Sequence, residues 1–263
     1  MGSKLDKAIV IKLGGATLGS HDTTIEDIVS LQERGRSLVL VHGGGKVITG
    51  WLKKRGIKTR FINGERVTDE ATLEVVVSVL VGVVNKEIVA DINARGGLAI
   101  GISGVDGALI QGKIKSKELG YVGEVAKINP APLEALLQAG YIPVVAPIAI
   151  DVKAEKSPRV LNVNADIVAG EIAAAIGAEK LVFLTDVAGV ADRSGNLLSR
   201  LSPGEAEALV ASGTASGGMI PKITACLKAL SAASAACIIV DGRQSHALID
   251  DINGQSGGTT IKK

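Results

Sequence analysis

The sequence predicts an α/β fold in which helices cover a mainly parallel β-sheet. Hydrophobic residues make up 46% of the 263 residues and aromatic residues only 2%, so Val, Ile, Leu and Ala must build the core, as they do in parallel sheets. The 33 glycines stand between apolar runs, and several of these runs end in a glycine loop before a helical pattern. The length allows two lobes that share a sheet, and we place the boundary near Gly177, between residues 1–177 and 178–263.

Composition and charge argue against several classes of protein. The net charge of +2 is spread along the chain, and few aromatic residues could stack on bases, so we expect no nucleic-acid partner. No signal-peptide pattern and no membrane-spanning stretch is found, which predicts a soluble cytoplasmic protein without a membrane partner. Cys226 and Cys237 lie in apolar, alanine-rich surroundings that predict buried free thiols.

The first apolar run, residues 9–13, predicts a buried strand that ends beside a lysine and two glycines. Lys12 would cost free energy there unless an anion meets it. Gly14 and Gly15 would let backbone N–H groups approach that anion, and the helix behind them adds a positive dipole end. The alternative is a lysine that reaches solvent beside a tight turn. A second strand within residues 37–45 also ends in glycines, which predicts a ligand site at the carboxyl edge of the sheet.

The glycine loops do not match three common motifs. Neither a dinucleotide-binding GxGxxG nor a Walker A loop is present. HGGG at residues 42–45 and GQSGG at residues 254–258 match two esterase motifs in their residue letters. No histidine follows Gly258, so the order of a hydrolase triad cannot be completed.

The segment from residue 68 to 96 predicts a long helix. Thr68 or Asp69 can cap it, and Gly96 and Gly97 end it. The valine-rich middle, residues 75–84, leaves a strand as the alternative, although length without proline favours the helix. Such a helix is apolar nearly all round and must be covered on more than one side. We therefore predict a homodimer through this segment.

The remaining elements follow from the same patterns. Short strands alternate with glycine turns over residues 98–128, interrupted by a basic loop at 113–117 that we expect to be solvated. Another buried strand is predicted within residues 141–150, and a later one within 180–190. Helices are predicted at 25–34, 47–55, 130–139, 167–176 and after Ser202, an N-cap followed by Pro203.

Five polar positions stand out among these elements. Asn162, Asn164 and Asp166 alternate, so on a strand they would share one face; the alternative is an ordinary cap of the next helix. Arg66 stands before a helix start, where it can hold a carboxylate bidentately or lie solvated on the surface. Lys222 is predicted at the start of a helix that follows a glycine loop.

Read together, the motifs resemble the amino acid kinase family over about residues 9–261. The motifs are KLGG (12–15), HGGG (42–45), GERVTD (64–69), VNK (84–86), SGVDG (103–107), NVNAD (162–166), LTDVAG (184–189) and GGMIPK (217–222). RVTD, NVNAD and GGMIPK in this order are specific to the branch that phosphorylates N-acetyl-L-glutamate in arginine biosynthesis. The resemblance implies the fold of this family, a three-layer α/β/α sandwich in two lobes.

The resemblance also implies a reaction, in which ATP phosphorylates the side-chain carboxylate of N-acetyl-L-glutamate. Lys12 and Lys222 would neutralise charge on the transferring phosphoryl group, and Asp166 would hold both lysines. An ionised carboxylate needs no general base. The substrate would be bound by Gly44, Gly45, Arg66 and Asn162. The nucleotide would be bound by Gly14, Gly15, Asp186, Val187, Ala188, Gly189, Val190, Ala191, Thr214, Ala215 and Ser216. Mg²⁺ is expected on the ATP phosphates rather than at a metal site of the protein.

The sequence departs from the pattern of this family at three places. Lys46 follows HGGG where proline is usual, Glu65 replaces an aliphatic residue beside Arg66, and residues 252–261 have drifted. About eight residues precede the first strand, too few for the N-terminal helix of arginine-inhibited hexamers, so we expect an arginine-insensitive dimer. The sequence leaves open whether a PII-type signalling partner binds the second lobe.

Three alternatives remain for the function. A kinase of carrier-bound aminoadipate or glutamate is disfavoured by RVTD with NVNAD. A non-catalytic sensor of nucleotides or amino acids on the same fold would be expected to have lost Lys12, Asp166 or Lys222, and all three are present. A Rossmann oxidoreductase lacks the glycine fingerprint.

Overall fold

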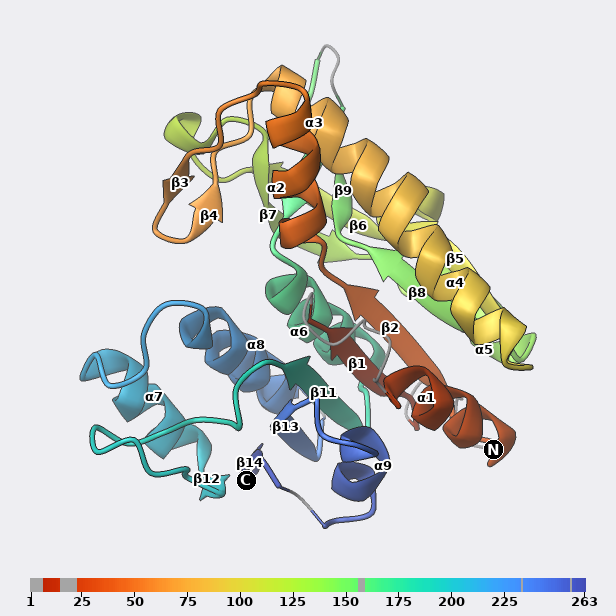
Figure 1. Ribbon diagram of the computed structural model, residues 1–263, viewed down its shortest axis with the longest axis vertical. Helices are drawn as coiled ribbons and strands as arrows, with labels where there is room; N and C mark the ends of the chain where they lie inside the picture. The colour runs from red at the N-terminus through yellow and green to blue at the C-terminus, as the bar shows by residue number, and fades with distance from the viewer. Residues whose placement is uncertain (1–6, 15–22, 156–158, 233, 256) are drawn as a thin grey trace.

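A computed structural model describes residues 7–14, 23–155, 159–232, 234–255 and 257–263. Within these residues, eight strands form one sheet in the order β12-β14-β13-β11-β1-β2-β8-β5 (Figure 1). Neighbouring strands run parallel except for β13 and β14, so the predicted mainly parallel sheet is confirmed. The strands are β1 (Ile9–Leu13), β2 (Leu38–His42), β5 (Ala99–Ser103), β8 (Ile142–Ala146), β11 (Lys180–Thr185), β12 (Arg200–Leu201), β13 (Ala236–Asp241) and β14 (Thr259–Ile261).

Helices cover both faces of this sheet and create two hydrophobic cores. Alternate side chains of each strand enter opposite cores: Val10 joins one, whereas Ile9 and Ile11 join the other. The first core is closed by α5 (Ala131–Gln138), α6 (Ala165–Ile176), α7 (Pro203–Ala211) and α8 (Met219–Ala232). The second is closed by α1 (Thr24–Glu33), α2 (Gly45–Lys54), α3 (Glu70–Val77), α4 (Asn85–Ala94) and α9 (Ala247–Ile252). This is the expected three-layer α/β/α sandwich.

Four strands form a small closed barrel and two more form a hairpin, separate from this sheet. The barrel strands are β6 (Ile110–Ile114), β7 (Val122–Ile128), β9 (Ile148–Asp151) and β10 (Val160–Val163), and the hairpin strands are β3 (Phe61–Ile62) and β4 (Glu65–Arg66). The single strand expected within residues 141–150 is divided at Pro147 into β8 and β9, which belong to different sheets. The basic loop expected at 113–117 is partly wrong, because Lys113 and Ile114 belong to β6.

The long helix expected from residue 68 is confirmed, and the strand alternative is wrong. Asp69 is its N-cap and accepts a hydrogen bond from the Thr72 N–H at 2.8 Å. Between α3 and α4 the chain continues as η1 (Ser78–Val84), a wider π-helical stretch. The side chain of Asn85 follows this stretch and is fully buried.

Other local predictions are also confirmed. Ser202 caps α7 in a capping box with Glu205, and both cysteines are buried free thiols. Gly177, where we place the lobe boundary, is the left-handed C-cap of α6; the division into two lobes stays a prediction. No helix in the described part of the chain is long and apolar enough to cross a membrane.

Candidate active site

The site begins at the carboxyl ends of β1 and β2, which are paired in parallel as the glycine loops predict. Lys12 points to the same face of the sheet as Val10, towards α6. Its Nζ lies 2.8 Å from one Asp166 oxygen, and Lys222 Nζ, from the first turn of α8, lies 2.9 Å from the other. The structure therefore joins the three residues predicted to be catalytic into one buried cluster.

Asp166 reaches this cluster from the first turn of α6. Asn164 is the N-cap of that helix and accepts hydrogen bonds from the N–H groups of Asp166 and Ile167 at 2.8 and 3.3 Å. The expectation that Asn162, Asn164 and Asp166 share the face of one strand is wrong, because β10 ends at Val163. The three side chains nevertheless line one cavity, because the change from strand to helix brings them together at the helix N-terminus.

The charge of Asp166 is maintained by its two lysines. Burial would raise the pKa of Asp166, but the attraction of Lys12 and Lys222 outweighs it and holds the pKa below the usual value. The carboxylate is thus ionised at neutral pH and shared between two ammonium groups. Such a group positions cations and is a poor proton acceptor, in agreement with the expected holding role.

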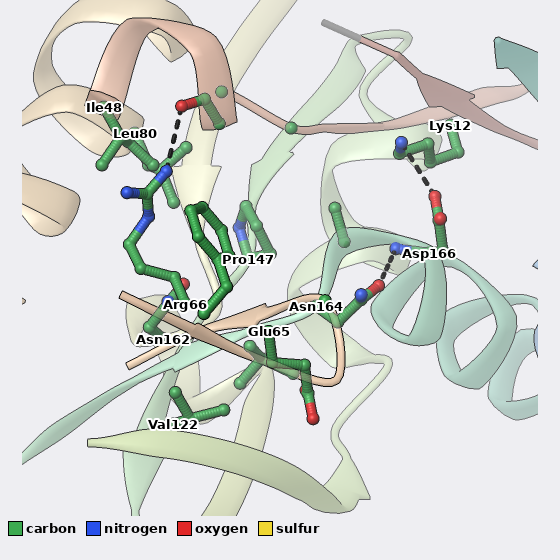
Figure 2. Close-up of a pocket in the computed structure, with 17 residues that line it drawn as sticks. Lys12, Ile48, Glu65, Arg66, Leu80, Val122, Pro147, Asn162, Asn164 and Asp166 are labelled. Atoms are coloured by element: carbon green, nitrogen blue, oxygen red, sulfur yellow. Dashed lines mark hydrogen bonds and ion pairs between the residues drawn. The ribbon is translucent and has the colours of Figure 1, made fainter. Parts of the chain in front are cut away.

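A cavity of about 230 Å³ extends from this cluster to Arg66. Figure 2 shows Arg66 on one side of the cavity and the Lys12–Asp166 pair on the other. The cavity is lined by Lys12, Gly43, Gly44, Gly45, Ile48, Phe61, Gly64, Glu65, Arg66, Leu80, Val122, Pro147, Asn162, Val163, Asn164, Ala165 and Asp166. The predicted substrate residues Gly44, Gly45, Arg66 and Asn162 all belong to this set. The N-terminus of α2, which begins at Gly45, adds a positive dipole end.

Arg66 is buried, with 9% of its surface exposed, so it is not a solvated surface arginine. Its Nη2 donates to the Gly45 carbonyl at 3.1 Å and to Thr49 Oγ1 at 2.9 Å, while Nη1 is buried without a hydrogen-bond partner. The ring of Phe61 lies 4.9 Å from the guanidinium carbon. A buried guanidinium with an unsatisfied donor is prepared to bind an anionic ligand.

Sequence reasoning missed the hairpin that carries Arg66 and Phe61. Asn63 and Gly64 both have positive φ, 49° and 82°, which is the conformation of a two-residue hairpin turn. The Asn-Gly pair at this point is a hairpin signal that could have been used.

Glu65, one of the departures from the family pattern, points away from the guanidinium of Arg66 in Figure 2. Its carboxylate forms an ion pair with Lys115 Nζ at 2.5 Å, across a separation of fifty residues. Lys46, the other departure beside the site, is exposed in the first turn of α2.

His42 supports the glycine loop from within the core. Its ring is fully buried; Nδ1 lies 2.9 Å from the Gly43 carbonyl and Nε2 lies 3.2 Å from Asn85 Nδ2. A neutral ring that donates through Nδ1 and accepts at Nε2 satisfies both contacts. Burial lowers the pKa of His42 to about 4, so this neutral form persists at neutral pH. The histidine of HGGG is therefore a support for the loop.

A second cavity, of about 350 Å³, lies where the loop after β11 meets the start of α8. It is lined by Val187, Ala188, Gly189, Val190, Ala191, Asp192, Gly195, Leu197, Thr214, Ala215, Ser216 and Met219. This set includes every residue predicted for the nucleotide in this part of the chain except Asp186. The C-terminal strand supports this cavity, because Thr259 Oγ1 accepts a hydrogen bond from the Val190 N–H at 2.8 Å.

Gly14 follows β1 at a close approach to β11. The Gly14 N–H donates to the Leu184 carbonyl at 2.9 Å, and a Cβ at Gly14 would lie 2.6 Å from that oxygen. Gly14 thus allows β1 and β11 to approach, and its contact with nucleotide stays a prediction; Gly15 lies outside the described residues.

No group of three acidic, histidine or cysteine side chains among the residues described could hold a metal ion.

Fold and site together are those of a phosphotransferase for small molecules. Lys12 and Asp166 of the lysine–aspartate–lysine cluster line the first cavity, and Lys222 shares the first turn of α8 with Met219, which lines the second. The chain belongs to the amino acid kinase family, whose model matches residues 7–241, and it is a kinase. It is 51% identical to the acetylglutamate kinase of Dehalococcoides mccartyi over 96% of this chain and 93% of that protein. It is 49% identical to the acetylglutamate kinase of a Nostoc species over 97% of this chain and 87% of that protein. The solved structure of smu.665 from Streptococcus mutans superposes with a TM-score of 0.83 at 27% identity, over 98% of this chain and 99% of that one.

Proposed function

We propose that this chain transfers the γ-phosphoryl group of ATP to the side-chain carboxylate of N-acetyl-L-glutamate, the step of arginine biosynthesis that gives N-acetyl-L-glutamyl 5-phosphate. The observation that carries the proposal is the Lys12–Asp166–Lys222 cluster. Lys12 and Asp166 line the first cavity, and Lys222 shares the first turn of α8 with Met219, which lines the second. Relatives about half identical over nearly their full length bear the name of this activity.

The first cavity suits a small dicarboxylate. The free Nη1 of Arg66 can bind the α-carboxylate of the substrate, and Asn162, whose Nδ2 donates to Thr68 Oγ1 at 3.2 Å, can contact the acetamido group. The side-chain carboxylate then lies towards Lys12 and the N-terminus of α2. The second cavity, with its small and apolar lining, suits the base and ribose of ATP, and Mg²⁺ arrives on the phosphates.

The reaction needs placement and charge more than proton transfer. A carboxylate oxygen attacks the γ-phosphorus, the bond from that phosphorus to the β,γ-bridging oxygen breaks, and ADP leaves with the bonding electron pair. Lys12 and Lys222 face the charge that moves during this transfer, and stabilisation of that charge is the main source of catalysis in phosphoryl transfer. Asp166 keeps both ammonium groups in place and takes no proton.

The two lobes and the dimer belong to the same proposal. Residues 1–177 carry the acceptor cavity and residues 178–263 carry most of the donor cavity, with β1 and β11 paired across the boundary.

The partly exposed valines Val77, Val81 and Val89 on the long helix, beside the exposed Gly82, form the face that we assign to a second copy of the chain. Light scattering should give the mass of a dimer; a monomer would contradict this assignment, and a hexamer would contradict the arginine-insensitive dimer.

The substrate is tested by trapping the acyl phosphate with hydroxylamine. The enzyme is incubated with ATP, Mg²⁺ and N-acetyl-L-glutamate, free glutamate or N-acetylaspartate, and the hydroxamate is measured. We expect hydroxamate from N-acetyl-L-glutamate at a rate far above the other two acids. Equal rates with all three, or none with any while ATP still binds, would contradict the proposal and favour a carrier-bound substrate or a sensor.

A further inference from the structure

Glu65, a residue of the lining, places a negative charge beside a cavity that, according to the proposed function, must admit a dianion. Two cations, Lys12 and Arg66, and two carboxylates, Glu65 and Asp166, are the charged side chains in the lining. By themselves these four charges would cancel. Side-chain charges that cancel would leave only the dipole at the N-terminus of α2 to favour a substrate with two carboxylates.

Each carboxylate of the lining is paired with a lysine that lies outside it. Asp166 is bound by Lys222 at 2.9 Å in addition to Lys12, and Glu65 is bound by Lys115 at 2.5 Å. The two external lysines offset the two carboxylates, which leaves the charges of Lys12 and Arg66 for the substrate. Removal of Lys115 would expose the substrate to an uncompensated carboxylate.

Backbone hydrogen bonds fix the loop that carries Lys115. Its N–H donates to the carbonyl of Val122, a lining residue, at 2.9 Å. The same loop is bound to the segment after Arg66, since Thr68 N–H donates to the Leu119 carbonyl at 2.9 Å and Tyr121 N–H donates to the Thr68 carbonyl at 2.7 Å. The hairpin and the loop before β7 are thus one connected unit, and the lysine opposite Glu65 is part of it.

We propose that Lys115 is a positioning and specificity residue of this enzyme, which neutralises Glu65 so that the acceptor cavity binds a dicarboxylate. This inference rests on the proposed function. It assigns a role to a residue fifty positions from its partner, and it explains how a carboxylate can occupy the position next to Arg66. The Glu65 side chain is 20% exposed, so its charge is only partly screened by solvent.

The chain offers a matched control in Lys113, which lies two residues earlier and is paired with Glu124 at 2.9 Å. Its side chain is 45% exposed, close to the 43% of Lys115, and neither Lys113 nor Glu124 lines the cavity. Lys113→Met and Lys115→Met therefore make the same change of net charge, but only the second leaves a lining carboxylate unpaired.

The experiment measures kcat and KM for N-acetyl-L-glutamate and ATP in the wild type and four variants: K113M, K115M, E65Q and the double variant E65Q/K115M. We expect K115M to raise KM for N-acetyl-L-glutamate about threefold to tenfold by repulsion, with kcat within about twofold and KM for ATP unchanged. E65Q should lower the same KM, since Lys115 is then uncompensated, and the double variant should return towards the wild type. K113M should match the wild type.

Two results would overturn the proposal. The first is a wild-type KM in K115M. The second is a rise of KM in both E65Q and K115M with no further change in the double variant, because a purely mechanical tie between hairpin and loop would give that pattern. Thermal unfolding of each variant identifies any loss of fold. E65Q tests independently whether the negative charge of residue 65 raises KM for N-acetyl-L-glutamate. Failure of the proposed function is a separate result, visible as a wild type without turnover of N-acetyl-L-glutamate.

Discussion

The replacement Asp166→Asn removes the anion that holds two buried lysines together while keeping the shape of the side chain. In the wild type the carboxylate lies 2.8 Å from Lys12 Nζ and 2.9 Å from Lys222 Nζ, and its side chain is 8% exposed. In the variant the two ammonium groups face an amide, which compensates neither charge. We therefore expect a loss of both stability and activity.

The size of the loss follows from the burial of the three groups. Removing one partner of a buried ion pair costs about 3–5 kcal/mol. The lysine side chains keep 11% and 12% of their surface exposed, which favours the lower end of that range. For a chain of this size, a loss of about 3 kcal/mol lowers the melting temperature by about 6–12 °C. Misplacement of the lysines by about 1 Å should also reduce kcat by about 10²-fold.

Thermal unfolding with and without ATP tests this reasoning, together with kcat from hydroxamate formation. ATP should stabilise D166N more than the wild type, because its phosphates supply the missing anion. Asp91→Asn is the control, since Asp91 is 63% exposed and 4.0 Å from Arg95, and surface pairs of this kind contribute little. A D166N enzyme that melts within about 2 °C of the wild type and keeps at least half of its kcat would refute the account.

Two further predictions concern Arg66 and His42. Arg66→Met should raise KM for N-acetyl-L-glutamate about 10- to 100-fold, because it removes a hydrogen bond to a charged group, and should leave KM for ATP unchanged. Arg55→Met is the control, since Arg55 is an exposed partner of Glu74. Equal KM values in the two variants would contradict the role of Arg66. The pKa of His42 is about 4 in the folded chain against 6.5 normally, because the ring is buried. As pH falls, His42 is protonated in the unfolded chain before it is protonated in the folded chain. The free energy of unfolding should therefore decline between about pH 6.5 and 4 by about 3 kcal/mol. His42→Gln should lack this decline in denaturant titrations, and parallel curves for both proteins would show that His42 is not its source.

Strand-end motifs made much of this site predictable from the sequence. A lysine in a buried strand before glycines requires an anion, and the structure supplies Asp166 to Lys12. Residues 187–191 and 214–216, which the resemblance to the family assigned to the nucleotide, line one cavity. For Lys12 the information was local, a charge and two glycines at the end of an apolar run.

Features that depend on distant pairing were not predictable in this way. The Glu65–Lys115 pair joins a hairpin to a loop fifty residues later, and no local pattern specifies that contact. The closed barrel of β6, β7, β9 and β10 mixes parallel and antiparallel pairs. The alternation of Asn162, Asn164 and Asp166 suggested a strand, but Asn164 begins a helix because its side chain caps the free N–H groups.

The role of Lys222 in phosphoryl transfer is tested most directly by kcat of Lys222→Met in the hydroxamate assay. Lys228→Met is the matched control on the same helix, where Lys228 is 51% exposed and paired with Glu171 at 3.3 Å. We expect K222M to lose about 10²- to 10³-fold in kcat, the cost of removing one charge-stabilising group, with both KM values nearly unchanged and K228M equal to the wild type. A K222M enzyme with kcat within a few fold of the wild type would contradict this role of Lys222.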